Sequence, residues 1–384
     1  MKKIMIMAML ALGATCSFAQ TDILKTIKKA KTYADAKQMV QAGISALSQE
    51  DQVKVCTKLM DLASKEFDAS HDKYMTRQLN KDFDVNTTYT AAGNLIREAV
   101  NFRNLDPKGF MKYLPSLDKA RQVMTEPGQE GLDENNPQKV FDYLSLYCDA
   151  SSAIFADDLS KDPVLPQIAY FTCNAAQRQN LFDQAIKYAG YALNDSTYGG
   201  ASMHILLTSM QKSLQTKADT LKYIEKAKSY LNKYTKGQAN AVVIENLYNA
   251  YTSIGERAQG QKFIDDVIAA DPNNFVALIL KGQNYMTEME YDKAIEALNK
   301  ALASQPNNAV IYTYLGTCYS YKAQDETNEA KKAEFYKTAI PYYDKAKELD
   351  PEKNISNWGY NRYNAYWNLY GEDDPRTVEA GKDQ

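Results

Sequence analysis

The chain has 384 residues, of which 45 % are hydrophobic and 24 % are charged. With 17 Gly and 11 Pro spread along it, this composition is that of a folded globular protein and excludes a largely disordered or collagen-like chain. The formal net charge is −3, and a single lysine-rich stretch stands out, at residues 25–37. These features argue against nucleic acid as the partner.

Residues 1–19 have the pattern of a secretory signal peptide. A basic start is followed by an apolar run over residues 4–14, which is too short to span a bilayer comfortably. Ser17 and Ala19 are small residues placed three and one positions before a cleavage that would leave Gln20 as the mature N-terminus. No second hydrophobic span follows in the sequence, so we expect no transmembrane span after signal cleavage.

The periplasm is the expected compartment, because the Phe-Ala-Gln ending resembles the signals of Gram-negative bacteria. The alternative is a lipoprotein anchored through Cys16, with envelope association or display at the cell surface. Thr15 is a poor fit to the small residue that usually precedes such a cysteine. Soluble export is therefore the favoured interpretation.

Within the stretch 25–37, Lys25, Lys28 and Lys29 share one face of a predicted helix. A solvated face is the simpler interpretation, and contact with an anionic surface is the alternative.

The region 20–155 is predicted to be helical but irregular. Segments 35–47 and 52–67 alternate apolar and polar faces with the helical period, and 88–102 with 107–124 resembles a helix pair with eroded spacing. The clearest predicted loop is "TEPGQEGLDENNP", at 125–137. We interpret 20–155 as diverged repeats of the architecture described below, with a separate helical domain as the alternative.

Four cysteines remain after signal cleavage, and none of them has C-x-x-C spacing. This pattern indicates neither a zinc site nor a thioredoxin-like motif. It also does not form a disulfide framework, so we expect small buried thiols. A Cys148–Cys173 disulfide remains open. The four are Cys56, Cys148, Cys173 and Cys318.

A repeat emerges when Pro272 and Pro306 are aligned, because equivalent residues then fall 34 positions apart. The units are 241–274, 275–308 and 309–353, and 156–240 holds weaker copies at 166–199 and 200–240. The aligned residues are Val242, Val276 and Val310, and Tyr251, Tyr285 and Tyr319.

Each unit is predicted to form two helices. In the second helix of the middle unit, apolar residues form one stripe at helical spacing: Ala294, Ile295, Leu298, Ala301 and Leu302. Small residues such as Gly282 allow paired helices to approach closely, and a proline ends each unit because it cannot continue a helix.

These units resemble the tetratricopeptide repeat family, on the segments "YDKAIEALNKALASQPNN", "GQKFIDDVIAADPNN" and "YKTAIPYYDKAKELDP". The resemblance covers about half of the chain and departs from the family pattern at Arg257 and Lys281. It implies an all-α fold, a right-handed superhelix (α-solenoid) of stacked helix-turn-helix repeats.

Two segments interrupt the period. Between Tyr319 and Ala339 the chain is longer than the family pattern, and the added residues are charged helix formers that we expect to lengthen both helices of the third unit. Residues 354–384 are expected to form a capping helix and tail. Their aromatic segment 358–370 would cover the last repeat, or would present a platform for sugar or peptide.

The resemblance also implies a concave groove lined by the first helix of each unit. In the family, a groove that binds a terminal carboxylate contains Lys or Arg, and none of the predicted groove residues is Lys or Arg. The groove therefore suits an extended backbone or an amphipathic helix. The alternative is that these residues form an ordinary solvated face. The groove residues are Val242, Glu245 and Asn249, then Val276, Ile279, Gln283 and Met286, and then Val310, Thr313, Thr317 and Tyr321, with Thr252, Ser253, Thr287 and Ser320 completing the set.

Catalytic motifs are missing from the sequence. The two histidines, His71 and His204, have no partner nearby in the sequence, and no zincin, nucleophile-elbow, P-loop or dinucleotide motif occurs. We expect no enzyme activity, no cofactor and no metal. The predicted function is a non-catalytic exported scaffold that binds a protein or peptide partner; the alternative is an outer-membrane-associated glycan-binding protein with a helical-repeat fold.

Overall fold

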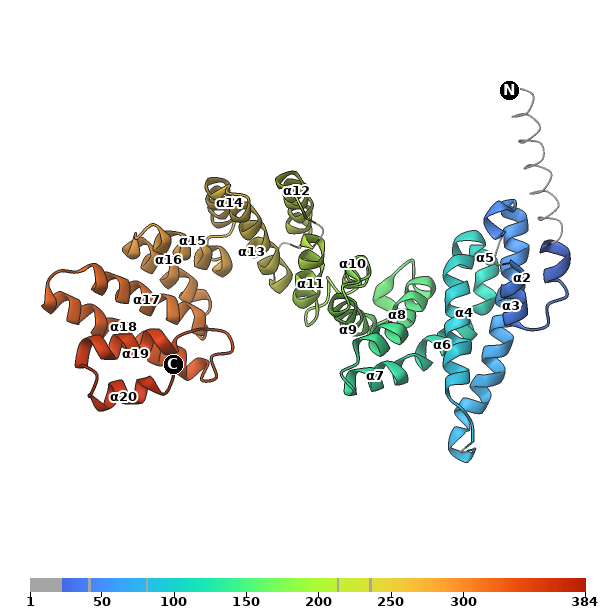
Figure 1. The fold of residues 1–384 in the computed structure, drawn as a ribbon. Helices are drawn as coiled ribbons and strands as arrows, with labels where there is room; N and C mark the ends of the chain where they lie inside the picture. The colour runs from blue at the N-terminus through green and yellow to red at the C-terminus, as the bar shows by residue number, and fades with distance from the viewer. Residues whose placement is uncertain (1–22, 41–42, 81, 213, 235–236) are drawn as a thin grey trace, which may run out of the picture. The chain divides into compact units, whose positions relative to one another are not determined.

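The computed structural model describes residues 23–384 apart from 41–42, 81, 213 and 235–236, and the predicted signal peptide at 1–19 lies outside the described residues. The described part contains helices and no strand (Figure 1). The prediction of an all-α fold built from paired helices is confirmed. The chain divides into two compact units, residues up to 213 and from 214 onward.

The first unit is built on two long helices, α3 and α4, with shorter helices packed around them. Its main core includes Leu59, Phe67, Leu95 and Phe102, which are almost fully buried. The helices are α2 (Tyr33–Val40), α3 (Gln49–Met75), α4 (Asn86–Leu105), α5 (Pro107–Phe110), α6 (Leu114–Val123), α7 (Thr125–Asp133), α8 (Pro137–Ile154), α9 (Leu165–Arg178), α10 (Phe182–Ala189) and α11 (Gly199–Gln211).

The predicted loop at 125–137 is wrong, because most of it forms helix α7. Its glycines permit a close crossing with α8. A Cβ at Gly131 would lie 2.8 Å from the backbone nitrogen of Val140, and one at Gly128 would lie 2.1 Å from Leu144 Cδ2. Pro127 lies in the first turn, where its missing N–H costs the helix no hydrogen bond.

The second unit contains the period-34 repeats as three antiparallel helix pairs, α13/α14, α15/α16 and α17/α18. The helices are α12 (Lys217–Lys233), α13 (Gly237–Ser253), α14 (Arg257–Ala270), α15 (Phe275–Thr287), α16 (Tyr291–Ser304), α17 (Ala309–Asp325), α18 (Glu329–Leu349), α19 (Gly359–Tyr370) and α20 (Pro375–Gly381).

The weaker copies upstream fit the structure unequally. The copy at 166–199 corresponds to the packed pair α9 and α10. The copy at 200–240 is divided, because α11 belongs to the first unit and α12 to the second. There α11 packs on α9 and α10, whereas α12 packs on α13.

The recurring "PNN" segments contain helix caps. Asn274 accepts a hydrogen bond from the backbone of Ala277, and Asn308 accepts bonds from Val310 and Ile311, so each satisfies free N–H groups at the start of a first helix. In α16 the predicted stripe faces the core, with Ala294, Leu298 and Ala301 fully buried. The repeat register is therefore set by caps and small residues together.

The third pair is longer than its neighbour, as the inserted charged residues predict. Helices α17 and α18 have 17 and 21 residues, compared with 13 and 14 in α15 and α16.

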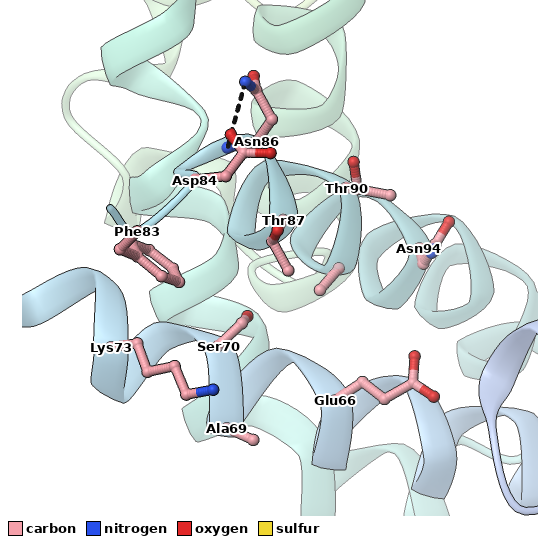
Figure 2. A pocket seen from close by; sticks show the side chains of 11 residues that line it. Glu66, Ala69, Ser70, Lys73, Phe83, Asp84, Asn86, Thr87, Thr90 and Asn94 are labelled. Carbon is pink, nitrogen blue, oxygen red and sulfur yellow. Dashed lines mark hydrogen bonds between the residues drawn. The ribbon is translucent and has the colours of Figure 1, made fainter. Parts of the chain in front are cut away.

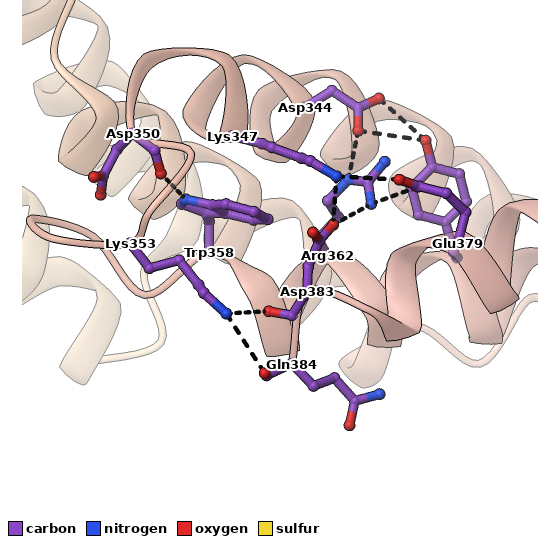
Figure 3. A network of polar contacts seen from close by, with 10 residues as sticks. Asp344, Lys347, Asp350, Lys353, Trp358, Arg362, Glu379, Asp383 and Gln384 are labelled. Atoms are coloured by element: carbon purple, nitrogen blue, oxygen red, sulfur yellow. Dashed lines mark hydrogen bonds and ion pairs between the residues drawn. The ribbon is translucent and has the colours of Figure 1, made fainter.

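The C-terminal segment forms two helices, α19 and α20, where a helix and a tail were expected. Figure 3 shows Arg362 of α19 surrounded by carboxylates. Its guanidinium contacts Asp344 at 2.7 Å, Glu379 at 3.1 Å and Asp383 at 2.8 Å. Trp358 is fully buried, and its indole donates to the Asp350 carbonyl at 2.8 Å (Figure 3).

Candidate binding groove

Five of the predicted groove residues line one pocket in the second unit. They come from α15 and α17, and the pocket is completed by the loop after α18 and by α19; its volume is about 330 Å³. We call it the groove pocket. It is lined by Met286, Val310, Thr313, Tyr314, Thr317, Tyr321, Ile355, Ser356, Asn357 and Asn361.

The two threonines of α17 that line the groove pocket are less polar than their side chains suggest. The Thr313 hydroxyl donates to the Ala309 carbonyl at 2.9 Å, and the Thr317 hydroxyl donates to the Thr313 carbonyl at 2.8 Å. Both hydroxyl protons are therefore used within α17. None of the described residues that line the groove pocket is charged.

Amide groups stand at the rim. Asn361 Nδ2 lies 3.4 Å from Thr317 Oγ1, and Asn357 is exposed. Gln283 does not line the pocket but donates from Nε2 to the hydroxyl of Tyr314 at 2.5 Å, which orients that ring. An amide carries both a donor and an acceptor, so it can pair with either half of a peptide group.

The loop that carries Ile355 and Asn357 is held by Asp350. Its carboxylate accepts backbone hydrogen bonds from Asn354 at 2.9 Å, Ile355 at 3.0 Å and Ser356 at 2.8 Å, and the Ser356 hydroxyl adds a fourth at 3.1 Å. Burial by itself raises the pKa of Asp350, but these bonds outweigh it and lower the pKa below its ordinary value of 3.8.

The remaining predicted groove residues lie elsewhere. Val276 and Ile279 are half-buried and pack against hydrophobic clusters, so they contribute to the core. Val242 is half-buried, and Glu245 and Asn249 are exposed on α13.

Sequence reasoning missed the part of the pocket that lies outside the repeats. Ile355 is 66 % exposed in a loop with no repeat register. The one available signal was an aliphatic residue isolated in the polar run "PEKNISN".

Two further pockets have a mixed polar lining. One lies between α3 and α4 in the first unit, has a volume of about 610 Å³ and contains Glu66, Lys73 and Phe83 (Figure 2). The other, of about 390 Å³, lies beside Trp367 in the second unit.

The two histidines that the sequence analysis singled out lie on different helices, α3 and α11. Burial is the main cause that lowers the pKa of His71, and His204 is exposed on α11. The described cysteines are free and buried, and burial raises the pKa of the Cys148 and Cys173 thiols. Among the described residues no group of three or more His, Cys, Asp or Glu could hold a metal ion.

The structure also bears on the predicted lysine face and on the predicted lack of a membrane span. Lys25, Lys28 and Lys29 are exposed. Within the described ranges, no helix has the length and apolar character that a membrane crossing requires.

Comparison with known proteins gives partial matches. No family model matches the chain. The mouse interferon-induced protein with tetratricopeptide repeats 2 is 28 % identical over 100 residues, 24 % of this chain and 21 % of the relative. The soybean Hsp70-Hsp90 organizing protein 1 is 26 % identical over 131 residues, 34 % of this chain and 22 % of the relative. The chain therefore spans about a fifth of these relatives.

Solved structures with a similar arrangement include MamA, at 21 % identity and a TM-score of 0.30, covering 50 % of this chain and 94 % of MamA. The APC/C hetero-tetramer Cut9-Hcn1 is 15 % identical with a TM-score of 0.35, covering 90 % of this chain and 68 % of that one. The sequence matches agree with the capped 34-residue helix pairs of the second unit. The repeat units of this chain are similar to tetratricopeptide repeats in sequence and in their pairing of helices.

Proposed function

We propose that this protein is a non-catalytic scaffold that binds an extended segment of another protein, with an apolar side chain of that segment seated in the groove pocket. The observation that carries the proposal is the convergence of α15, α17, α19 and the 355–357 loop on one uncharged pocket. The soybean relative is named as an organizer of two other proteins, which supports a scaffold role.

The chemistry of the pocket favours a peptide over a charged ligand. Met286, Val310 and Ile355 offer aliphatic contact, and burial of apolar surface gives about 25 cal/mol per Å². Asn357 and Asn361 at the rim can pair with peptide N–H and C=O groups. Phosphate or a terminal carboxylate would need Lys or Arg, which the described lining lacks.

We also propose that the protein is exported to the periplasm. The proposal is supported by the basic start, apolar run and small cleavage residues of segment 1–19. The mass of the mature protein tests it: cleavage before Gln20 is expected, whereas a lipid-modified Cys16 at the N-terminus would indicate an anchored protein.

The binding test uses random ten-residue peptides displayed on phage and selected on the full chain. We expect enriched peptides that share an apolar residue. Ile355→Lys places a charge at the exposed rim of the uncharged pocket, so it should weaken those peptides at least about tenfold, the equivalent of 1.4 kcal/mol. Fluorescence anisotropy with synthetic copies measures the change.

The matched control is Val378→Lys on α20. Val378 is an aliphatic residue of similar exposure, 56 %, and it does not line the groove pocket. It should bind like the original protein. Absence of any enriched peptide, or equal binding by the Ile355→Lys protein, would refute the proposal.

A further inference from the structure

A second pocket in the same unit includes a partly exposed tryptophan. Trp367 is 45 % exposed on α19, whereas Trp358 at the start of the same helix is fully buried. We call the space beside it the Trp367 pocket. It is lined by Glu329, Lys332, Ala333 and Tyr336 of α18 and by Trp367, Asn368, Gly371 and Glu372 at the end of α19.

A second aromatic residue, Tyr336, also contributes to this pocket. Tyr336 lines the Trp367 pocket, and only 3 % of the residue is accessible. A phenol hydroxyl can donate or accept a hydrogen bond, so Tyr336 adds a polar group that can contact a ligand in this pocket.

The charges around the indole are mainly negative. Glu329 and Glu372 contribute two carboxylates. Lys332 is the one cation in the lining, and its Nζ lies 3.9 Å from Glu329 Oε1, at the limit of an ion pair. With the carbonyl oxygen of Asn368 and the Tyr336 hydroxyl, the pocket offers acceptors around an aromatic face, and a tryptophan face attracts cations.

The two pockets lie along the same helix. Asn361 lines the groove pocket and Asn368 lines the Trp367 pocket. Seven residues of helix span about 10 Å, and an extended peptide covers that distance in about three residues. Asn361, Asn364 and Asn368 recur on α19 at spacings of three and four, which places these asparagines on one face of the helix.

We propose that the Trp367 pocket takes a lysine or arginine side chain of the bound peptide, three or four residues from the apolar side chain in the groove pocket. This inference rests on the proposed function and specifies the partner as a segment that combines one apolar and one basic anchor. Cation–π attraction and the two carboxylates supply the recognition.

The test begins with the peptides selected on the full chain. We expect Lys or Arg at the predicted spacing. In synthetic copies, replacing that residue with Gln should weaken binding about tenfold, within the range of a partly desolvated cation–π contact with charge assistance. The same replacement should cost clearly less binding in a Trp367→Ala protein, because the cation–π part of the contact is already lost while the two carboxylates remain. Tyr360→Ala removes an aromatic of α19 that is 58 % exposed and lines neither pocket, and should behave like the original protein.

The outcomes separate this inference from the proposed function. The inference is overturned if the selected peptides contain no basic residue. It is also overturned if replacing the basic residue with Gln weakens binding to the Trp367→Ala protein as much as to the original protein. In either case, weaker binding by the Ile355→Lys protein still supports the groove pocket. Insensitivity to Ile355→Lys overturns the proposed function itself. Fluorine NMR of protein labelled with 5-fluorotryptophan tests whether the pocket binds sugar instead. A Trp367 signal that shifts with maltohexaose or chitohexaose, and not with peptide, overturns the inference in favour of a sugar site.

Discussion

At the scale of single residues, the groove pocket depends on one buried carboxylate that does not touch its ligand space. Asp350 follows the last repeat helix and is 5 % exposed. It binds three successive backbone N–H groups and thereby fixes the positions of Ile355 and Asn357. Sequence reasoning recognised the "ELDPEK" segment as a helix stop, but the loop it organises has no periodicity from which a binding role could be predicted.

Asp350→Asn is expected to destabilise the second unit and weaken peptide binding, because an amide cannot accept all four hydrogen bonds. Since folding lowers the pKa of this carboxyl below 3.8, its ionisation stabilises the fold at pH values above about 4. The contribution is lost as pH falls through the lowered pKa. Urea denaturation at pH 7 and at decreasing acidic pH should show the difference between the two proteins shrinking below about pH 4. A difference that grows on acidification would contradict the assignment.

At the scale of elements, small residues decide which helices cross closely. Gly282 and Gly316 lie where a Cβ would come within 2.8 Å of Leu298 Cγ and 2.7 Å of Tyr343 Cε1, respectively. Glycines at a close helix crossing also occur in α7, where they led to the incorrect prediction of a loop at 125–137. Gly128 and Gly131 suggest a turn in a single sequence, and only the presence of α8 against them shows that they belong to a helix crossing.

Ala301→Asp should destabilise the second unit by several kcal/mol, because a carboxylate would enter the fully buried crossing of α16. Ala303→Asp is the matched control, because it introduces the same carboxylate in the same last turn of α16 at an exposed position. Chemical denaturation followed by circular dichroism measures both. Equal stability of the two variants would show that the repeat register is wrong.

Arg362→Met should loosen α20, because it removes the cation that links Asp344 of α18 to Glu379 and Asp383. Lys347 would still pair with the latter two carboxylates. Removing one partner of a buried ion pair costs about 3–5 kcal/mol. The lower end is expected here, because Asp344 and Glu379 are 43 % and 51 % exposed as side chains. Hydrogen exchange should rise in α20 and remain slow in α15 and α16. Unchanged protection of α20 would assign its docking to apolar contacts alone.

At the scale of the whole molecule, the chain divides into two compact units. One cluster of buried described residues extends over 27–153, and three clusters formed by described residues of the repeat region lie beyond residue 214. The sequence predicted the repeat half well, because each unit copies the same caps, prolines and alanine stripe. It predicted the first half poorly, since its helices vary in length, and it did not reveal the boundary that separates α11 from α12.

Residues 214–384 alone should therefore fold. We expect the fragment to show the helical content of this half and one cooperative thermal transition, because three hydrophobic clusters of described residues lie within it. It should also bind the selected peptides with unchanged affinity, since both pockets lie within it. A fragment that remains unfolded while the full chain is stable would refute the independence of this unit.

The way Asp350 holds its loop has a consequence for how binding preference could diversify. The carboxylate accepts hydrogen bonds from the main chain at Asn354 and Ile355, so those bonds do not depend on which side chains stand there. Selection, natural or in the laboratory, can therefore exchange the side chains at 355 and 357 while the repeats keep their sequence. The loop would then vary in its side chains while the repeats that support it stay constant. Libraries randomised at these two positions offer a direct route to scaffolds with new ligands.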